Sequence, residues 1–214
     1  MFKKRDFTMV ELLVVIAIIA ILASLLLPAL NMAKSQAQSI SCIGQLKQHS
    51  LLFMSYADNY NDYIPAQNAP GTTQYPNYRW YYALFDQIYS STAQYNGIYS
   101  TKQNELMRCP SDQGFAFTIS DVSYGINYRI SNGPGNVTVR MNTLKRPSIF
   151  ILDGDSSPNA VGNAIIETPQ FGMGVGSLHN KSANVLYADY HVENSKYLGI
   201  GMFGTNGMWY PAQN

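Results

Sequence analysis

A long apolar run near the N-terminus constrains this chain more than any other feature. Between Leu12 and Leu30 the only polar side chain is Ser24. As a helix, at ~1.5 Å per residue, the run spans roughly 28 Å, about the thickness of a bilayer's hydrocarbon core. A basic cluster at residues 3–5 precedes it. We therefore expect one membrane-spanning helix, with its N-terminus in the cytoplasm and the rest of the chain outside.

Glu11 lies inside the first turns of this segment, where a carboxylate is costly in lipid and therefore argues for a role. A secretory signal peptide would have a shorter apolar core and an early small-x-small cleavage site. The nearest such site here, Ser35–Ala37, lies well beyond the run. A plain membrane anchor accounts for the length and the basic flank, but it does not account for Glu11.

The stretch from Phe7 to Leu30 begins Phe-Thr-Met-Val-Glu-Leu and resembles the N-terminal segment of type IV pilin-like proteins. In that family a basic leader precedes a Phe, and a Glu follows at the fifth mature position. The resemblance implies cleavage between Asp6 and Phe7 by prepilin peptidase, N-methylation of Phe7 and a role for Glu11 in subunit assembly. The family's leader normally ends in Gly, so Asp6 departs from the pattern at the cleavage position.

The resemblance also implies a partner for Glu11, the α-amino group that cleavage frees on Phe7 of a neighbouring subunit. That contact would set the register between subunits, because only one axial offset pairs both charges. The alternative is an isolated Glu near the lipid headgroups that reaches water by snorkelling.

These features divide the chain into a leader (1–6), a membrane-spanning half-helix (7–30), an outer amphipathic half-helix (31–58) and a globular head (59–214). The helix is expected to continue past Pro28 and to end at the polar stretch Asp58–Asp62, before Pro65. Its apolar stripe is predicted from residues at near-helical spacing: Ala33, Ala37, Ile40, Ile43, Leu46, Leu51 and Met54.

In the head, a short helix is predicted within Arg79–Tyr89, and the remaining signals favour strands and turns. The predicted strands are Ser123–Ile130, Ser148–Asp153, Ala183–Ala188 and His191–Glu193. The expected fold is α+β and pilin-like, with a long N-terminal helix packed on a mostly antiparallel sheet.

The pilin-like resemblance extends into the head through scattered blocks. These are Cys109–Asp112, Ser123–Tyr128, Arg146–Ser148, and His179 followed after nine residues by Asp189. The last pair resembles an H-x9-DG motif. Because Tyr190 replaces the motif's Gly, which suits a tight hairpin, we expect a different type of turn there.

Cys42 and Cys109 would both lie outside the cytoplasm, where disulfides persist. A bridge would close a loop of 67 residues and stabilise the fold by about 4 kcal/mol in the loop-entropy model. The alternative is two buried thiols.

Two groups of residues invite a metal reading. Asp153 and Asp155 begin an alternating series of oxygen ligands, but Pro158 and Ala164 occupy the places where an EF-hand needs Gly and Glu. We therefore favour a polar loop over a calcium site. His179, Asp189 and His191 are similarly better explained by hydrogen bonds that fix the hairpin than by a metal or catalytic centre, so no cofactor is expected.

Charged residues make up only 13% of the chain and the net charge is +1, a balance that does not favour nucleic acid as a partner. All sixteen Tyr follow residue 55, where they offer amphipathic contact area. No active-site motif occurs; the GxGxxG at 199–204 is not followed by a helix pattern.

The favoured function is that of a non-enzymatic minor pilin or pseudopilin in a type II secretion or type IV pilus-like assembly. It would be a single-pass protein of the bacterial inner membrane. Its partners would be prepilin peptidase, other pilins or pseudopilins, and the assembly machinery. The alternative is a membrane-anchored, Tyr-rich surface binding protein, with glycan as its candidate ligand, that only borrows the pilin anchor.

Overall fold

The structure is a computed structural model that describes residues 8–66, 68–69, 78–85, 105–112, 122–127, 138–156, 165–166, 178–179 and 182–195. The chain divides into two compact units, Met1–Ala37 and Gln38–Asn214.

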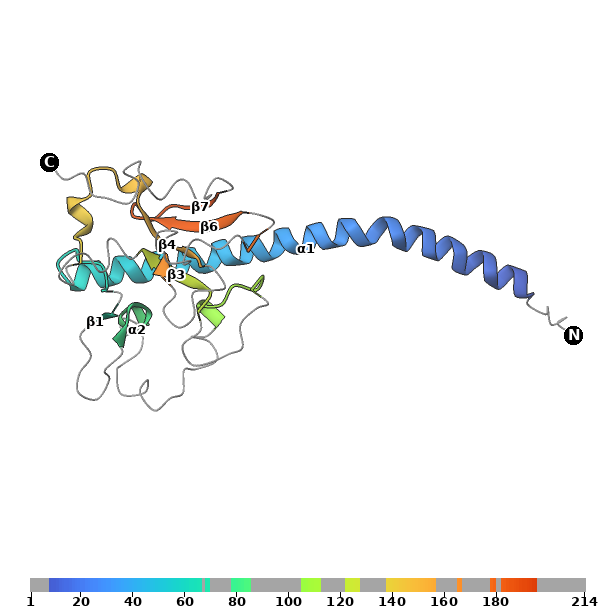
Figure 1. Cartoon of the computed structure of the whole chain (residues 1–214), viewed down its shortest axis with the longest axis horizontal. Helices are drawn as coiled ribbons and strands as arrows, with labels where there is room; N and C mark the ends of the chain where they lie inside the picture. The colour runs from blue at the N-terminus through green and yellow to red at the C-terminus, as the bar shows by residue number, and fades with distance from the viewer. Residues whose placement is uncertain are drawn as a thin grey trace, which may run out of the picture. The chain divides into compact units, whose positions relative to one another are not determined.

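A single helix, α1, runs from Met9 to Asn59 and contains Pro28 in its interior. It ends where Asn61 and Asp62 adopt positive φ angles of 53° and 63°, a conformation that stops a helix. The predicted continuous helix and the predicted stop are therefore both confirmed (Figure 1).

In the first unit, α1 carries apolar side chains that this chain does not bury. An 18-residue window of the helix has a mean hydropathy of 3.0, and none of it is buried. Leu25, for example, is 71% exposed. By length and composition this part of α1 is able to cross a membrane.

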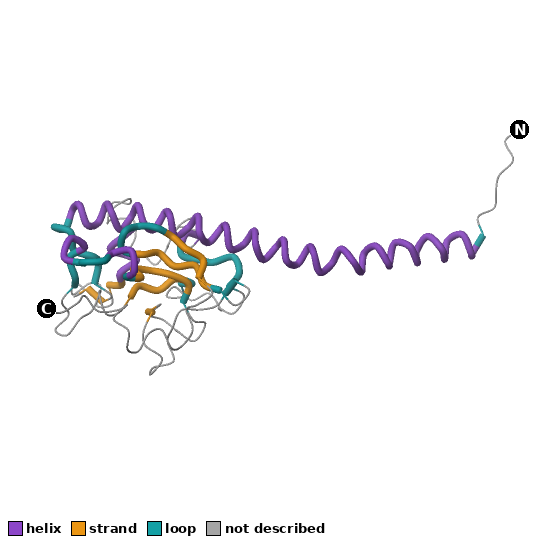
Figure 2. Tube along the Cα trace, turned by 90° about the horizontal axis from the view of Figure 1, so that it is seen from above, coloured by secondary structure: helices purple, strands orange, loops and turns teal. Residues whose placement is uncertain are grey.

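The second unit holds a five-stranded sheet with the order β5-β3-β4-β6-β7. The pairs β3–β4, β4–β6 and β6–β7 are antiparallel, and β3–β5 is parallel. The strands are β3 (Tyr124–Asn127), β4 (Ile151–Asp155), β5 (Ile165–Ile166), β6 (Ala183–Tyr187) and β7 (Val192–Ser195). This mostly antiparallel sheet beside α1 confirms the predicted α+β fold (Figure 2).

Smaller elements complete this unit. They are the strand pair β1 (Asn68–Ala69) and β2 (Tyr78–Arg79), the short helix α2 (Trp80–Phe85), and the 3-10 turns η2 (Met141–Thr143) and η3 (Pro147–Ile149). Helix α2 falls within the predicted range, of which residues 86–89 lie outside the described part of the chain. Residues 128–130 of the strand predicted to begin at Ser123 also lie outside it.

The strand predicted from Ser148 begins too early. Residues 147–149 form η3 instead, and β4 starts at Ile151. Pro147 is preset for a helical φ, and the Phe150 N–H donates to its carbonyl at 3.3 Å, so the chain turns once before it extends.

The predicted apolar stripe on the outer half of α1 is only partly right: Leu46 is buried as predicted, but the stripe as a whole does not follow the buried face. Ile40 and Leu51 are 62% and 63% exposed in this chain. The buried face instead contains Cys42, Leu46, His49 and Phe53, which are three or four residues apart and therefore share one side of the helix. A stripe that includes a histidine and a cysteine is missed when only large apolar residues are counted.

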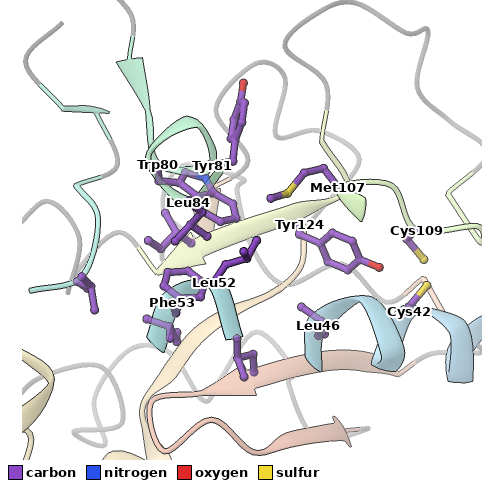
Figure 3. Close-up of a cluster of buried hydrophobic side chains, with 14 residues drawn as sticks. Cys42, Leu46, Leu52, Phe53, Trp80, Tyr81, Leu84, Met107, Cys109 and Tyr124 are labelled. Atoms are coloured by element: carbon purple, nitrogen blue, oxygen red, sulfur yellow. The ribbon is translucent and has the colours of Figure 1, made fainter. Parts of the chain in front are cut away.

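The core of this unit forms where that face meets the sheet and α2 (Figure 3). Phe53 stacks on Trp80 with their ring centroids 5.9 Å apart. Tyr124, Ile126, Leu152 and Leu186 from the sheet are fully buried beside them. The helix is thus a central element of the core rather than an appendage.

Candidate functional site

The N-terminus of α1 is closed by a capping box. Thr8 precedes the helix, and the Glu11 Oε2 atom accepts from the Thr8 backbone N–H at 2.8 Å and from its hydroxyl at 2.7 Å. The Glu11 N–H donates in return to Thr8 Oγ1 at 3.3 Å. This reciprocal pattern satisfies donors that a helix start leaves unpaired. The Thr-x-x-Glu spacing was a readable signal for it in the sequence.

Both of the carboxylate's hydrogen bonds end on Oε2, and Oε1 has no partner among the described residues. Glu11 therefore caps the helix through Oε2, while its Oε1 atom is available for a contact with another molecule. Asp6 and Phe7, the residues expected to flank the cleavage, lie outside the described residues, so cleavage and methylation stay predictions.

A buried ion-pair geometry joins α1 to the sheet. His49 Nδ1 lies 2.6 Å from Asp153 Oδ2, and both side chains are fully buried. His49 Nε2 lies 3.1 Å from the Leu106 carbonyl oxygen, and the His49 ring meets Tyr124 edge-on at 5.0 Å. Sequence reasoning did not single out His49, because its partner is 104 residues away.

These contacts place one hydrogen on His49 Nε2 and a second one between His49 Nδ1 and Asp153 Oδ2. A carbonyl can only accept, so His49 Nε2 carries a hydrogen that it donates to Leu106. The remaining proton lies between Nδ1 and Asp153, on one atom or the other. Burial raises the pKa of Asp153, an effect that His49 and the Gly154 N–H partly offset. In either state the pair is neutral overall, which is the condition for burying it.

A second buried cluster lies on the same face of α1, at the level of Cys42. The Cys42 and Cys109 sulfurs and a ring nitrogen of His179 all lie within 4.8 Å of one another. His179 Nε2 is 3.3 Å from Cys109 Sγ and 3.4 Å from Asp155 Oδ2. Figure 3 shows the two sulfur atoms directed toward one another. Both cysteines are free thiols in the structure; the disulfide stays a prediction.

Three groups of this cluster, Cys109, Asp155 and His179, have raised pKa values. A hydrogen bond with the Cys42 thiol, together with burial, raises the pKa of Cys109. Burial also raises the pKa of Asp155 well above its usual range. Burial lowers the pKa of His179, but the hydrogen bond with Cys109 and the nearby Asp155 outweigh that effect and raise it overall.

The structure places His179 and Asp189 in different settings. His179 lies with Cys109 and with Ser111 Oγ, 3.1 Å from its Nδ1. Asp189 instead hydrogen-bonds the ring and the N–H of His191 at the β6–β7 turn. His179 and Asp189, which the H-x9-DG-like pattern joins in the sequence, therefore belong to two separate sites in the structure.

The β6–β7 turn departs from a two-residue hairpin. The Tyr187 N–H donates to the His191 carbonyl at 2.9 Å and so encloses a three-residue loop. Tyr190 adopts a φ of 69°, the left-handed conformation that favours glycine.

Asp153 and Asp155 are strand residues of β4, not members of an exposed loop. Asp153 faces His49, while Asp155 Oδ2 accepts from the Asn184 N–H at 2.7 Å. The other oxygen atoms of the calcium series, on residues 157 and 159, lie outside the described residues.

Comparison with known proteins identifies the N-terminal segment. Residues 3–27 match the model of the prokaryotic N-terminal methylation motif. No curated protein and no solved structure matches the chain. The match supports the predicted type IV pilin-like prepilin segment and leaves the head's H-x9-DG-like pattern as a prediction.

Proposed function

We propose that this chain, a pilin- or pseudopilin-type membrane-anchored subunit by its prepilin segment, is a minor pilin or pseudopilin of a type II secretion or type IV pilus-like assembly. Prepilin peptidase removes the leader before Phe7, and the α-amino group of Phe7 is then methylated. The subunit crosses the bacterial inner membrane once, with its N-terminus in the cytoplasm and its head outside. Its partners are other pilins or pseudopilins and the assembly machinery.

One observation carries this proposal: the methylation motif at residues 3–27 is continuous with the 51-residue helix α1. The first half of that helix exposes its apolar side chains, and its last turns are built into the core of the head. A helix of this kind anchors a subunit in lipid before assembly and offers an apolar surface to neighbouring helices afterwards.

Glu11 supplies the specific contact. Its Oε1 atom has no partner among the described residues, while Oε2 holds the start of the helix through Thr8. Cleavage before Phe7 leaves the Thr8 amide intact, so the capping box survives processing. Oε1 is then the atom that accepts from the new amine of a neighbouring subunit.

A non-enzymatic role is supported by the burial of two histidine–aspartate pairs among the described residues. His49 and Asp153 are fully buried, and His179 and Asp155 nearly so. Side chains sealed in this way hold the head together and do not meet a substrate from solution. The head is thus proposed to act by contact with other subunits.

Glu11→Ala tests the proposal in the native membrane. We expect leader processing and head folding to continue, while incorporation into assemblies, measured by crosslinking and co-purification of pilin-like subunits, is lost. Glu193→Gln, at an exposed position of β7, is the matched control and should co-assemble normally. Normal co-assembly of Glu11→Ala, with cleavage verified, would contradict the proposal. Retained secretion without the gene, together with polysaccharide binding by the protein, would favour the surface-binding alternative.

A further inference from the structure

The most unusual chemistry of the head lies in the cluster of Cys42, Cys109, His179 and Asp155, which the proposed function does not use. The four side chains come from four separate places in the chain: α1, the segment 105–112, the bridge at 178–179 and strand β4. All four are buried. Cysteine sulfur and imidazole nitrogen are the ligand atoms of structural zinc sites, and carboxylate oxygen also binds zinc.

The spacing between His179 Nε2 and Cys109 Sγ suits two ligands of a tetrahedral ion, and Cys42 lies close enough to join them as a third. With Zn–S at about 2.3 Å and Zn–N or Zn–O at about 2.0–2.1 Å, neighbouring ligand atoms are separated by roughly 3.3–3.8 Å. The observed separations are 3.3 Å from His179 Nε2 to Cys109 Sγ and 3.4 Å from the same nitrogen to Asp155 Oδ2. The Cys42 sulfur lies within 4.8 Å of both Cys109 Sγ and the His179 nitrogen.

Hydrogen bonds alone leave this cluster incompletely satisfied. His179 Nε2 faces Cys109 and Asp155 at almost the same distance, and a single N–H cannot serve both fully. Asp155 Oδ1 is buried and has no hydrogen-bond partner among the described residues. A buried acceptor left in this way is costly, and a cation is one means of satisfying it.

The surroundings hold the donors in place. Ser111 Oγ lies 3.1 Å from His179 Nδ1, so that ring nitrogen has its own partner and Nε2 is turned into the cluster. The Asn184 N–H donates to Asp155 Oδ2 at 2.7 Å and orients the carboxylate. Contacts of this kind to the atoms behind the ligands are a regular feature of metal sites.

We propose that Cys42, Cys109 and His179 form a structural binding site for a thiophilic divalent cation, Zn²⁺ above all, beside the buried carboxylate of Asp155. Cys42 and Cys109 bind as thiolates and His179 binds through Nε2, while Asp155, whose Oδ2 atom lies 3.4 Å from that nitrogen, is a neighbouring carboxylate rather than one of the three ligands. Two thiols lose their protons to solvent as the ion binds. The ion ties α1 to the loop at Cys109 and to the segment at His179, and its site is distinct from the prepilin segment.

A disulfide between Cys42 and Cys109 is the competing state, since it would consume both thiolates. It would leave His179 and Asp155 in the cluster with no task beyond hydrogen bonding each other. Metal content and thiol state, measured on the same sample, separate the two states.

The test uses the full chain in detergent micelles, purified from native membranes without reductant or chelator. We expect about one equivalent of zinc by elemental mass spectrometry and two cysteines that become alkylated only after denaturation with chelator. Zinc removal under reducing conditions, followed by Co²⁺ addition, should give the visible bands of tetrahedral cobalt and the ultraviolet band of a thiolate–cobalt bond.

Cys42→Ser and His179→Ala should each abolish stoichiometric binding, and Asp155→Asn should weaken it at least tenfold. His191→Ala, a histidine outside the cluster, is the matched control and should bind normally. Because a variant that does not fold also fails to bind, the unfolding midpoint of the wild-type chain is compared with and without Zn²⁺, and we expect zinc to raise it. Cys42 and Cys109 joined as a disulfide in native-membrane protein, or no stoichiometric binding by the reduced wild-type chain, would overturn the site.

Discussion

The two halves of α1 differ in which side chains they expose and which they bury. In the first unit the helix points Leu, Ile and Val side chains outward, and the chain itself buries none of that window. In the second unit the same helix points Cys42 and His49 inward, and both are fully buried. The first half therefore needs cover from outside the chain, by lipid or by other subunits, whereas the second must pair its polar groups within the chain. Hydropathy alone describes only the first half.

The largest effect is expected from breaking the buried pair on the second half. Asp153→Ala removes the partner of His49 Nδ1 and leaves that buried nitrogen without its hydrogen bond, so the free energy of unfolding should fall by about 3–5 kcal/mol. Urea unfolding of the full chain in micelles, followed by the fluorescence of the buried Trp80, measures it.

Lys47→Ala, at an exposed position on the same helix, should stay within about 0.5 kcal/mol of wild type. Adding His49→Ala to Asp153→Ala should cost less than the sum of the single losses, because the two side chains are directly coupled. Strictly additive losses would show that the pair has no coupling.

One substitution made in each half tests the comparison directly. Leu46→Ala removes a fully buried side chain and should lower the free energy of unfolding of the head by about 2–5 kcal/mol. Leu25→Ala, at a side chain that is 71% exposed in the chain, should leave the same urea transition unchanged. Equal losses at the two positions would mean that the first half of α1 is also covered by the head.

A smaller effect is expected from two glycines with opposite surroundings. A Cβ at Gly154, in β4 between the two buried aspartates, would lie 2.9 Å from the Asn184 carbonyl oxygen and 2.9 Å from Val185 Cγ1. Gly154→Ala should therefore destabilise the head by about 1–3 kcal/mol.

Gly44 is the matched control, because a Cβ there meets nothing within 4 Å. It lies inside α1, so Gly44→Ala should stabilise the protein by about 0.5–1 kcal/mol. Thermal unfolding of both variants in micelles shows whether each substitution lowers or raises the stability of the protein. A stabilised Gly154→Ala would contradict the close packing of β4 against β6.

The sequence predicted what depends on long, local patterns. The apolar run and its basic flank predicted α1 together with its membrane-spanning half, and the strand and turn signals predicted β3, β6 and β7 closely. The Phe-Thr-Met-Val-Glu segment predicted the methylation motif.

What escaped prediction depends on contacts between distant residues. His49 and Asp153 are 104 positions apart, and nothing local to either residue announces the pair. The cluster at Cys42 likewise needs the fold to bring His179 to Cys109. The register between β4 and β6 shifts between Ile151 and Asp153, and an alternating pattern in the sequence does not predict such a shift. The Thr-x-x-Glu spacing of the capping box is present in the sequence, but Glu11 was interpreted from the sequence only as an assembly residue.

The most direct test of the pilin-type function is mass spectrometry of the N-terminus of the chain taken from its native membrane. A prepilin-type subunit should begin at Phe7 and carry one added methyl group on its α-amino nitrogen, with residues 1–6 absent. A chain that still begins at Met1, and carries no methyl group at Phe7, would contradict that function.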